Sequence, residues 1–438
     1  GRSLKSPRRE GPMKKTLFIF PAILTVVFLL FSCPPPGGGG SPVAVTVTDM
    51  STHYRVVIDV GDGSHYEIGR EYARKMLQVV PDWEVIVDSY IAEMAFVFDY
   101  TTLLSRAADI TPQIPQAYKD ELEGVYSMLS GTPVNTAGDD KVSKDELYLI
   151  NLIPDIIDYS ACSAVSVFGG LSSNGSTITG RNLDWADGFF HEFARLQDVV
   201  IIKNGSRSIS LIGCLGFLGA ITAVNDNGVF GAILLSPVSG YDSTNKRSYS
   251  FDLRYALENY STMDQVAAYM ADGSREYAFG HLIFLSDATG SKVVENDITQ
   301  AGNRPIRSYS SSLNAGVAAW PTPALDYSIG AVNSFVYNGN TDNHTGDGDN
   351  TSRWASMISE LSAAADAGTK ITVDELKSVI SFDNGDGPDS MSTGDLYNSS
   401  TKQCIIFQPQ TMDLEIYFIA RDGTLADDPV FETIDLDF

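Results

Sequence analysis

The chain has 438 residues, with 55 acidic side chains against 30 basic ones and a formal net charge of −25. A protein this acidic repels phosphate groups, which excludes binding to nucleic acid or to an anionic membrane surface through charge. Four cysteines in a chain of this length indicate a fold that relies on its hydrophobic core rather than on a disulfide framework.

The first 32 residues have the pattern of an export signal. A basic stretch ends in Met13-Lys14-Lys15, and an apolar run over residues 17–31 leads to Ser32-Cys33. This run is shorter than the ~20 residues that a membrane-spanning helix needs, and Pro21 lies within it. The segment Leu30-Phe31-Ser32-Cys33 resembles a bacterial lipobox. We therefore predict a leader and lipoprotein signal peptide over residues 1–32, with a lipid on Cys33.

Residues 33–55 are expected to form a tether, since a proline run followed by glycines is first stiff and then flexible. Lipid and tether together predict an exported protein that is anchored to the membrane of the bacterial cell envelope, on its periplasmic or cell-surface side. The alternative is a cleaved secretory signal followed by a disordered mature terminus.

The hydrophobic pattern changes from helical to strand-like at about residue 161. Apolar residues recur at helical spacing over residues 67–79, 83–100 and 113–129, so residues 56–161 are predicted to be mostly helical. Residues 162–438 contain short β-branched or aromatic runs that predict strands at 196–203, 208–212, 228–235, 281–285, 292–295, 404–408 and 414–420. Helices are expected at 251–260, 263–270, 351–363 and 373–380. This order suits two packed sheets covered by helices on both outer faces.

Cys162 is the candidate nucleophile. It stands behind small residues at the head of a strand-like run, and after a Gly/Ser/Asn turn the chain returns into Arg181-Asn182-Leu183-Asp184. A hairpin would bring Arg181 and Asp184 back beside Cys162. A thiol is a useful nucleophile only as thiolate, and a nearby guanidinium lowers its pKa while a carboxylate orients a charged partner. The remaining Cys214 and Cys404 are expected as small buried hydrophobes, with a bridge between them as the alternative.

The segment from Tyr159 to Asp184 resembles the N-terminal-nucleophile (Ntn) hydrolases, and within them the choloylglycine hydrolases, acid ceramidases and isopenicillin N acyltransferase-like cysteine peptidases. The resemblance implies an α+β fold, the Ntn-hydrolase four-layer αββα sandwich. It also implies a precursor that cuts itself between Ala161 and Cys162, into small and large chains that stay associated. The freed α-amino group would serve as general base, because such a group titrates near pH ~8.

Further matches to these families carry chemistry. Ala331-Val332-Asn333-Ser334-Phe335 resembles the strand end that places an asparagine amide on the scissile carbonyl; the alternative is a strand-terminating asparagine. Ser352-Arg353 matches a Ser-Arg pair of the acyltransferase branch. Arg353 would then hold Asp184 or the surroundings of the nucleophile, against the alternative of a solvated helix arginine.

One departure from the families concerns the strand after Gly228. Related enzymes carry a second asparagine there, whereas this chain has Ile233-Leu234-Leu235-Ser236. Ser236 or a backbone N–H is expected to substitute as donor, or else the pocket is drier. Asn182, inside the returning strand, is expected to support the site.

Other chemistries have no motif in the chain. None of the five histidines has metal-ligand spacing, and neither a nucleophile elbow nor a phosphate-binding loop is present. The sequence therefore predicts a linear amide C–N hydrolase or acyltransferase without metal or other cofactor, acting on a small-molecule N-acyl amide. The expected catalytic residues are Cys162, Arg181, Asp184, Asn333 and Arg353. A non-catalytic ligand- or partner-binding lipoprotein with the same fold and a papain-like cysteine protease remain as alternatives.

Overall fold

The computed structural model describes residues 41–438 except residues 133, 158–160, 301, 303, 321, 323, 367–369, 386 and 389–392. The predicted leader, Cys33 and the first part of the tether lie outside the described residues. Within the described ranges, none of the helices is both long enough and apolar enough to cross a membrane.

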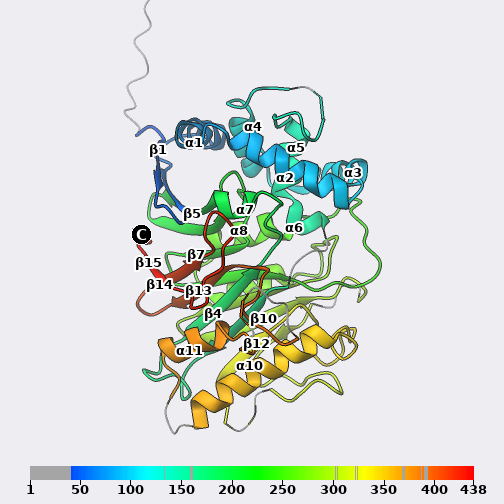
Figure 1. Cartoon of the computed structure of the whole chain (residues 1–438), viewed down its shortest axis with the longest axis vertical. Helices are drawn as coiled ribbons and strands as arrows, with labels where there is room; N and C mark the ends of the chain where they lie inside the picture. The colour runs from blue at the N-terminus through cyan, green and yellow to red at the C-terminus, as the bar shows by residue number, and fades with distance from the viewer. Residues whose placement is uncertain are drawn as a thin grey trace, which may run out of the picture. The chain divides into compact units, whose positions relative to one another are not determined.

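Two sheets form the centre of the described part of the chain (Figure 1). The nine-stranded sheet runs in the order β1 (Ala44–Asp49), β2 (Tyr54–Asp59), β5 (Gln197–Asn204), β6 (Arg207–Cys214), β7 (Thr222–Asn225), β8 (Phe230–Leu235), β9 (His281–Asp287), β10 (Gly290–Asn296) and β11 (Ile306–Arg307). The six-stranded sheet runs in the order β12 (Ser328–Ala331), β3 (Ser163–Val167), β4 (Ile178–Asp184), β13 (Thr401–Gln408), β14 (Asp413–Phe418) and β15 (Glu432–Ile434). The strand pairs are antiparallel except β2 with β5, which is parallel.

The two sheets face each other across a mixed apolar and hydroxyl-rich layer. Phe230 of β8 stacks on Phe407 of β13 with ring centroids 5.9 Å apart. In the same layer, the Thr179 hydroxyl of β4 donates to the Ser286 hydroxyl of β9 at 2.8 Å. Since each sheet supplies one partner of these contacts, the sheets are packed face to face.

Helices cover both outer faces, so the predicted α+β four-layer αββα sandwich is confirmed. On the nine-stranded sheet lie α8 (Tyr249–Asn259) and α9 (Met263–Met270), and on the six-stranded sheet lie α10 (Gly348–Asp366) and α11 (Val373–Ile380). Glycines in the strands let these helices approach. A Cβ at Gly231 would lie 3.1 Å from Leu253 of α8, and a Cβ at Gly180 would lie 2.8 Å from Ile380 of α11.

The helices that precede Cys162 form a group at one end of the sandwich, at the top of Figure 1. They are α1 (His65–Val79), α2 (Trp83–Val97), α3 (Tyr100–Ile110), α4 (Gln116–Tyr126), α5 (Lys144–Asn151) and α6 (Ile153–Ile156), while the short α7 (Glu192–Leu196) follows β4. The helix predicted over 83–100 ends earlier than expected. The Asp99 carboxylate accepts a hydrogen bond from Thr102 N at 2.8 Å and caps a separate helix, α3.

Residues 44–59 are two strands, where a tether and the start of a helical segment were expected. β2 pairs with β5 from Tyr54 opposite Asp198 to Asp59 opposite Lys203, and Val56 and Ile58 are buried. Burial alternates along residues 54–59 with the period of a strand, which accounts for the difference. The alternative bridge between Cys214 and Cys404 does not form, because these cysteines are unpaired and belong to different sheets.

Candidate active site

The β3–β4 hairpin brings Cys162 and Arg181 together, as the sequence predicted. Ser163 lies opposite Asn182, and Ala164 lies opposite Arg181. Arg181 Nη2 donates to Cys162 Sγ at 3.6 Å, and the thiol faces the main-chain oxygen of Asp184 at 3.9 Å. The antiparallel register therefore places the end of β4 beside the head of β3.

The Cys162 thiol is buried, with 2% of the residue exposed. Burial raises the pKa of the thiol, and the positive charge of Arg181 offsets only part of that effect. The expectation that a guanidinium would lower the thiol pKa is right for this one interaction and wrong for the net shift. In the chain as described, the thiol is therefore protonated at neutral pH.

Arg181 is fully buried and only partly hydrogen-bonded. Besides Cys162, its Nη2 contacts Ile233 O at 3.2 Å. Its Nε and Nη1 have no hydrogen-bond partner among the described residues. A buried guanidinium with open donors is costly to fold, and such groups are concentrated at functional sites. Arg181 is thus free to bind an anionic group that forms beside Cys162.

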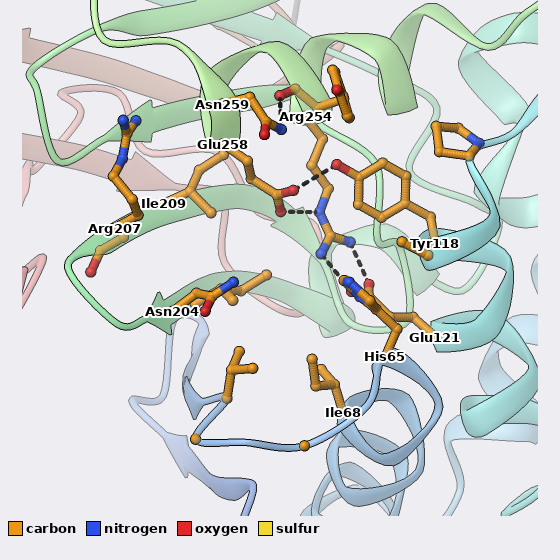
Figure 2. Close-up of a pocket in the computed structure, with 18 of the residues that line it drawn as sticks. His65, Ile68, Tyr118, Glu121, Asn204, Arg207, Ile209, Arg254, Glu258 and Asn259 are labelled. Carbon is orange, nitrogen blue, oxygen red and sulfur yellow. Dashed lines mark hydrogen bonds and ion pairs between the residues drawn. The ribbon is translucent and has the colours of Figure 1, made fainter.

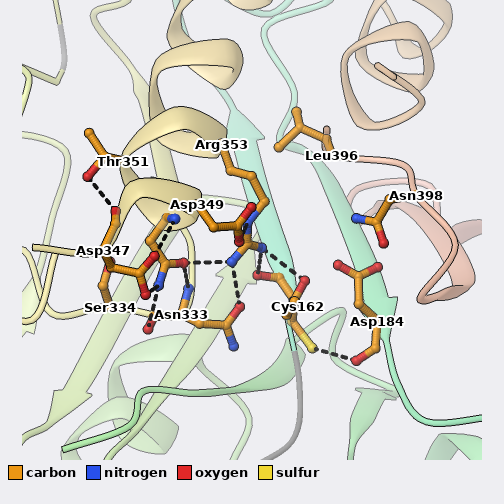
Figure 3. Close-up of polar contacts among 12 residues, drawn as sticks. Cys162, Asp184, Asn333, Ser334, Asp347, Asp349, Thr351, Arg353, Leu396 and Asn398 are labelled. Atoms are coloured by element: carbon orange, nitrogen blue, oxygen red, sulfur yellow. Dashed lines mark hydrogen bonds and ion pairs between the residues drawn. The ribbon is translucent and has the colours of Figure 1, made fainter. Parts of the chain in front are cut away.

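Asp184 lies on the other side of the strand from Arg181, because residues three positions apart in a strand point to opposite faces. Figure 3 shows its carboxylate turned toward Asn398, while its main-chain oxygen faces Cys162 Sγ. Oδ1 accepts from the Thr401 hydroxyl at 2.7 Å, and Oδ2 has no partner within the described part of the chain. Burial raises the pKa of Asp184 to about 6, against the opposing effects of Arg353 and Thr401. Among the described residues no hydrogen bond joins Arg181 to Asp184, and each of the two flanks Cys162 separately.

Arg353, on the first turns of α10, holds the backbone on both sides of Cys162. Its Nη1 donates to Ala161 O and to Cys162 O, each at 2.9 Å (Figure 3). Its Nε donates to Asp349 Oδ2 at 2.9 Å. Arg353 is 2% exposed, so the alternative of a solvated helix arginine is wrong. The guanidinium is instead fixed on the two carbonyls that bracket the candidate nucleophile.

Asn333 lies just beyond the end of β12 and joins the same network. Its Oδ1 accepts from Arg353 Nη2 at 3.2 Å, and its Nδ2 donates to Leu235 O at 2.7 Å. A primary amide carries two N–H groups, so one hydrogen remains for a second acceptor. Asn333 is buried and tied to Arg353, which places an amide dipole within the site.

Two of the predicted supporting residues contact other parts of the fold. Asn182 Nδ2 donates to Ile380 O at 2.7 Å and to Leu396 O at 2.6 Å, so its side chain secures α11 and the loop that precedes β13. Ser352 lies against the turn at Gly394, where a Cβ would be 3.4 Å from Ser352 Cβ. Both residues therefore stabilise the outer layer of the six-stranded sheet.

Ser236 lies at the end of β8, buried, and takes part in a contact between loops. Its Oγ accepts from Asn343 Nδ2 at 3.0 Å, and its N–H donates to Gly280 O at 2.9 Å. The backbone of this strand contributes more directly to the site, because Ile233 O and Leu235 O receive the Arg181 and Asn333 donors.

Sequence reasoning missed two residues that complete the site. Thr401, the first residue of β13, lies opposite Asp184 and donates to it, although the two are 217 positions apart. Asn350 bonds both Asn333 and Arg353. Its only sequence signal is its place in a polar loop directly before a predicted helix, where side chains commonly bond backbone groups.

An apolar cavity of about 250 Å³ lies between α2 and the residues after β4. Its walls include Tyr90 and Met94 of α2, Ile153 and Ile157 near the predicted cleavage point, and Trp185. Trp185 directly follows Asp184, whose main-chain oxygen faces the thiol. One wall of the cavity is therefore the residue that follows Asp184 in the chain, and the lining does not include the apolar strand 233–235.

A larger pocket of about 590 Å³ lies away from Cys162, between α1, α4, the β5–β6 hairpin and α8 (Figure 2). Its buried charges pair with each other. Arg254 binds both oxygens of Glu121, at 2.6 and 2.9 Å, and its Nε binds Glu258 at 2.8 Å. His65 bonds Glu121 at 2.8 Å, and the Tyr118 hydroxyl donates to Glu258 at 2.6 Å.

This pairing makes the larger pocket a structural junction. Burial opposes ionisation of Glu121, but Arg254 and His65 outweigh it and lower the pKa of this carboxyl. The network joins α1 and α4, which precede residue 161, to α8, which follows it. It holds the two parts of the chain together on either side of the predicted cleavage point.

Similarity to known proteins is found at the level of solved structures. No protein-family model and no curated protein match the chain. Among solved structures, the chain is similar to a Caenorhabditis elegans ortholog of N-acylethanolamine-hydrolyzing acid amidase, with 17% identity, a TM-score of 0.40, and coverage of 57% of this chain and 93% of that chain. It is similar to a mutant of conjugated bile acid hydrolase from Clostridium perfringens, with 14% identity, a TM-score of 0.37, and coverage of 63% of this chain and 96% of that chain.

A third similar structure is penicillin V acylase from Agrobacterium tumefaciens, with 15% identity, a TM-score of 0.39, and coverage of 63% of this chain and 86% of that chain. These likenesses concern the fold alone. The sheets and outer helices of the chain itself form the αββα sandwich that the resemblance to Ntn hydrolases implied, with Cys162 directly before β3, an inner strand of the six-stranded sheet.

Proposed function

We propose that this chain is a self-activating cysteine hydrolase of the Ntn type that acts on linear amide C–N bonds. The observation that carries the proposal is the pair of hydrogen bonds that Arg353 Nη1 donates to Ala161 O and Cys162 O. The Cys162 thiol beside them faces Arg181. Ala161 O belongs to the bond whose cleavage makes Cys162 N-terminal. A charged donor on that oxygen polarises the carbonyl for attack.

Self-cleavage begins when Cys162 Sγ attacks the carbonyl carbon of Ala161. The C–N bond to Cys162 breaks, the thiol proton passes to the departing nitrogen, and Ala161 becomes a thioester on Sγ. Water then hydrolyses the thioester to the Ala161 carboxylate and regenerates the thiol. The open Oδ2 of Asp184 has the charge needed to bind the new α-amino group of Cys162.

In turnover, the α-amino group takes the thiol proton and Sγ attacks the substrate carbonyl. The second amide hydrogen of Asn333, together with a backbone N–H, stabilises the negative oxygen of the tetrahedral intermediate. The amine leaves with a proton, and water or an acceptor amine resolves the acyl-cysteine. Arg181, with open donors beside Sγ, stabilises the thiolate between these steps.

The apolar cavity beside Trp185 supports an acyl chain as the part of the substrate that gives affinity. The net charge of −25 disfavours strongly anionic head groups. We therefore expect N-acyl amino acids of low charge, penicillin-type side-chain amides or N-acyl amines to be cut faster than taurine-conjugated bile salts.

The test compares wild type with Cys162→Ala and Cys162→Ser on a panel of those amides, with acyl-cysteine trapped for mass spectrometry. Wild type should show two chains, an acyl adduct on Cys162 and faster cleavage of those three classes of amide than of taurine conjugates. The alanine variant should stay one folded, inactive chain, and the serine variant should be cut slowly. Amide hydrolysis by the alanine variant would place the nucleophile elsewhere, and a preference for taurine conjugates would contradict the proposed substrate class.

The location of the enzyme belongs to the same proposal. The signal-like segment 1–32 and the lipobox-like residues before Cys33 support export and anchoring through a lipid on Cys33. Metabolic labelling with a radioactive fatty acid should mark the small chain of wild type and leave a Cys33→Ser variant unlabelled. Equal labelling of both would contradict the anchor.

A further inference from the structure

Asn350 lies between Asn333 and Arg353 and bonds both of them. It belongs to the first turn of α10 and is 4% exposed. Its amide oxygen accepts from Arg353 Nη2 at 2.6 Å and from Asn333 N at 3.1 Å. Its amide nitrogen donates to Asn333 O at 3.2 Å and to Asp347 Oδ2 at 2.9 Å. Both ends of one side-chain amide are thus engaged within the site.

The bonds to Asn333 fix the direction of that residue. In an antiparallel sheet, a residue of the neighbouring strand accepts a hydrogen bond from its partner's N–H and donates one to the same partner's C=O. The Asn350 side chain makes both of these bonds with Asn333. β12 has such a partner, β3, only as far as Ala331. Asn350 continues this pairing by means of a side chain, and so orients the Asn333 amide toward Leu235 O and Arg353.

The bond to Arg353 fixes the guanidinium. A long arginine side chain must be held at several nitrogens to keep Nη1 on two carbonyls at once. Asp349, the partner of Nε, is 55% exposed, so water screens that ion pair. Asn350 is the buried anchor, and its bond to Nη2 at 2.6 Å is the shortest of the contacts that hold the guanidinium.

We propose that Asn350 is a positioning residue for self-cleavage, which holds Arg353 and Asn333 as one rigid unit against the carbonyls of Ala161 and Cys162. This inference rests on the proposed function and names Asn350 as the residue that orients Arg353 and Asn333. Because a misplacement of about 1 Å costs about a hundredfold in rate, loss of this bridge should slow cleavage strongly.

The first experiment measures how fast newly synthesised precursor is converted into two chains in a cell-free system. Asn350→Ala should slow conversion roughly tenfold to a hundredfold, with near-UV circular dichroism reporting a folded precursor. Thr351→Ala is the matched control. The Thr351 hydroxyl donates to the carbonyls of His344 and Asp347, so its loss loosens the same turn without removing a bond to Arg353. This control should cut itself at close to the wild-type rate.

The second experiment uses Asn350→Asp, which keeps the oxygen that accepts from Arg353 and Asn333 N. When the new carboxyl is ionised, its other oxygen faces Asn333 O and Asp347 and is repelled; when the carboxyl is protonated, its one hydrogen is donated to one of these two acceptors. The charged groups around this position are Asp347 and Arg353, with Asp349 on the same turn and His344 beside Asp347. The ratio of the variant's cleavage rate to that of wild type should therefore rise as the pH falls.

The outcomes separate the inference from the function on which it rests. If wild type never cuts itself, the proposed function fails and the inference fails with it. If wild type cuts itself and Asn350→Ala does so equally fast, only the positioning role is overturned. A Thr351→Ala variant as slow as Asn350→Ala, or an Asn350→Asp rate ratio that is flat with pH, would also overturn it, since a merely structural role predicts both.

Discussion

Arg254 and Arg181 are both buried in this chain, but their surroundings differ. Arg254 binds Glu121 through two nitrogens and Glu258 through a third, and its Nη1 also donates to Leu218 O. Arg181 has open Nε and Nη1 donors among the described residues and a thiol as its ionisable neighbour. A buried cation with matched partners therefore stabilises a junction, whereas one with open donors weakens the fold and is available for chemistry.

The largest effect on stability should come from breaking the matched network. Arg254→Met leaves Glu121 buried without its main partner, so the free energy of unfolding should fall by about 3–5 kcal/mol. The measurement is urea unfolding in the Cys162→Ala background, where the chain stays in one piece. Arg254→Met with Glu121→Leu should recover most of the loss. If Arg254→Met alone were neutral, this network would not be the junction between the two parts of the chain.

The reverse pattern is expected at Arg181. Arg181→Met removes open buried donors, so stability should be unchanged or improved, while turnover should fall roughly a hundredfold to a thousandfold. The pH profile of iodoacetamide labelling at Cys162 should move to higher pH, because the guanidinium no longer favours the thiolate. Normal turnover combined with a loss of stability like that of Arg254→Met would remove the distinction between the two arginines.

A smaller, pH-dependent effect is expected at Asp184. Its pKa is raised from 3.8 to about 6 in the folded chain, so between these pH values the folded state binds more protons than the unfolded state. The free energy of unfolding therefore falls as the pH rises through this window. The whole destabilising effect of the ionised Asp184 is present above about pH 6. Asp184→Asn keeps an oxygen for Thr401 and removes the charge.

In the Cys162→Ala background, Asp184→Asn should stabilise the chain at pH 7 by on the order of 1–3 kcal/mol, and the gain should vanish near the unfolded pKa of 3.8. Urea unfolding at both pH values measures it. A gain that is independent of pH would contradict the raised pKa of this carboxyl.

Local sequence patterns predicted the sandwich because its elements carry their own signals. The helices at 263–270 and 373–380 coincide with α9 and α11, each of which begins after a threonine that caps it. β1 and β2 were missed because a short strand beside a Gly/Pro run resembles a tether until its partner is known. That partner, β5, begins 138 positions beyond β2's last residue, Asp59.

The same limit applies to the site. The proximity of Cys162 and Arg181 could be predicted from the sequence because a hairpin is a local structure. Ser352 was misplaced although its neighbour Arg353 lies in the site, since adjacent residues on a helix point about 100° apart. Asn350 and Thr401 reach their partners only through packing of the outer helix and of a distant strand, which one sequence does not reveal.

Whether Cys162 is an N-terminal nucleophile is decided by the N-terminal sequence and intact mass of the polypeptides in an active preparation. The proposed function predicts two chains that copurify, a small one ending at Ala161 and a large one that begins at Cys162. A fully active preparation with one uncut chain, or a large chain that begins at any other residue, would contradict the assignment of Cys162 as an N-terminal nucleophile.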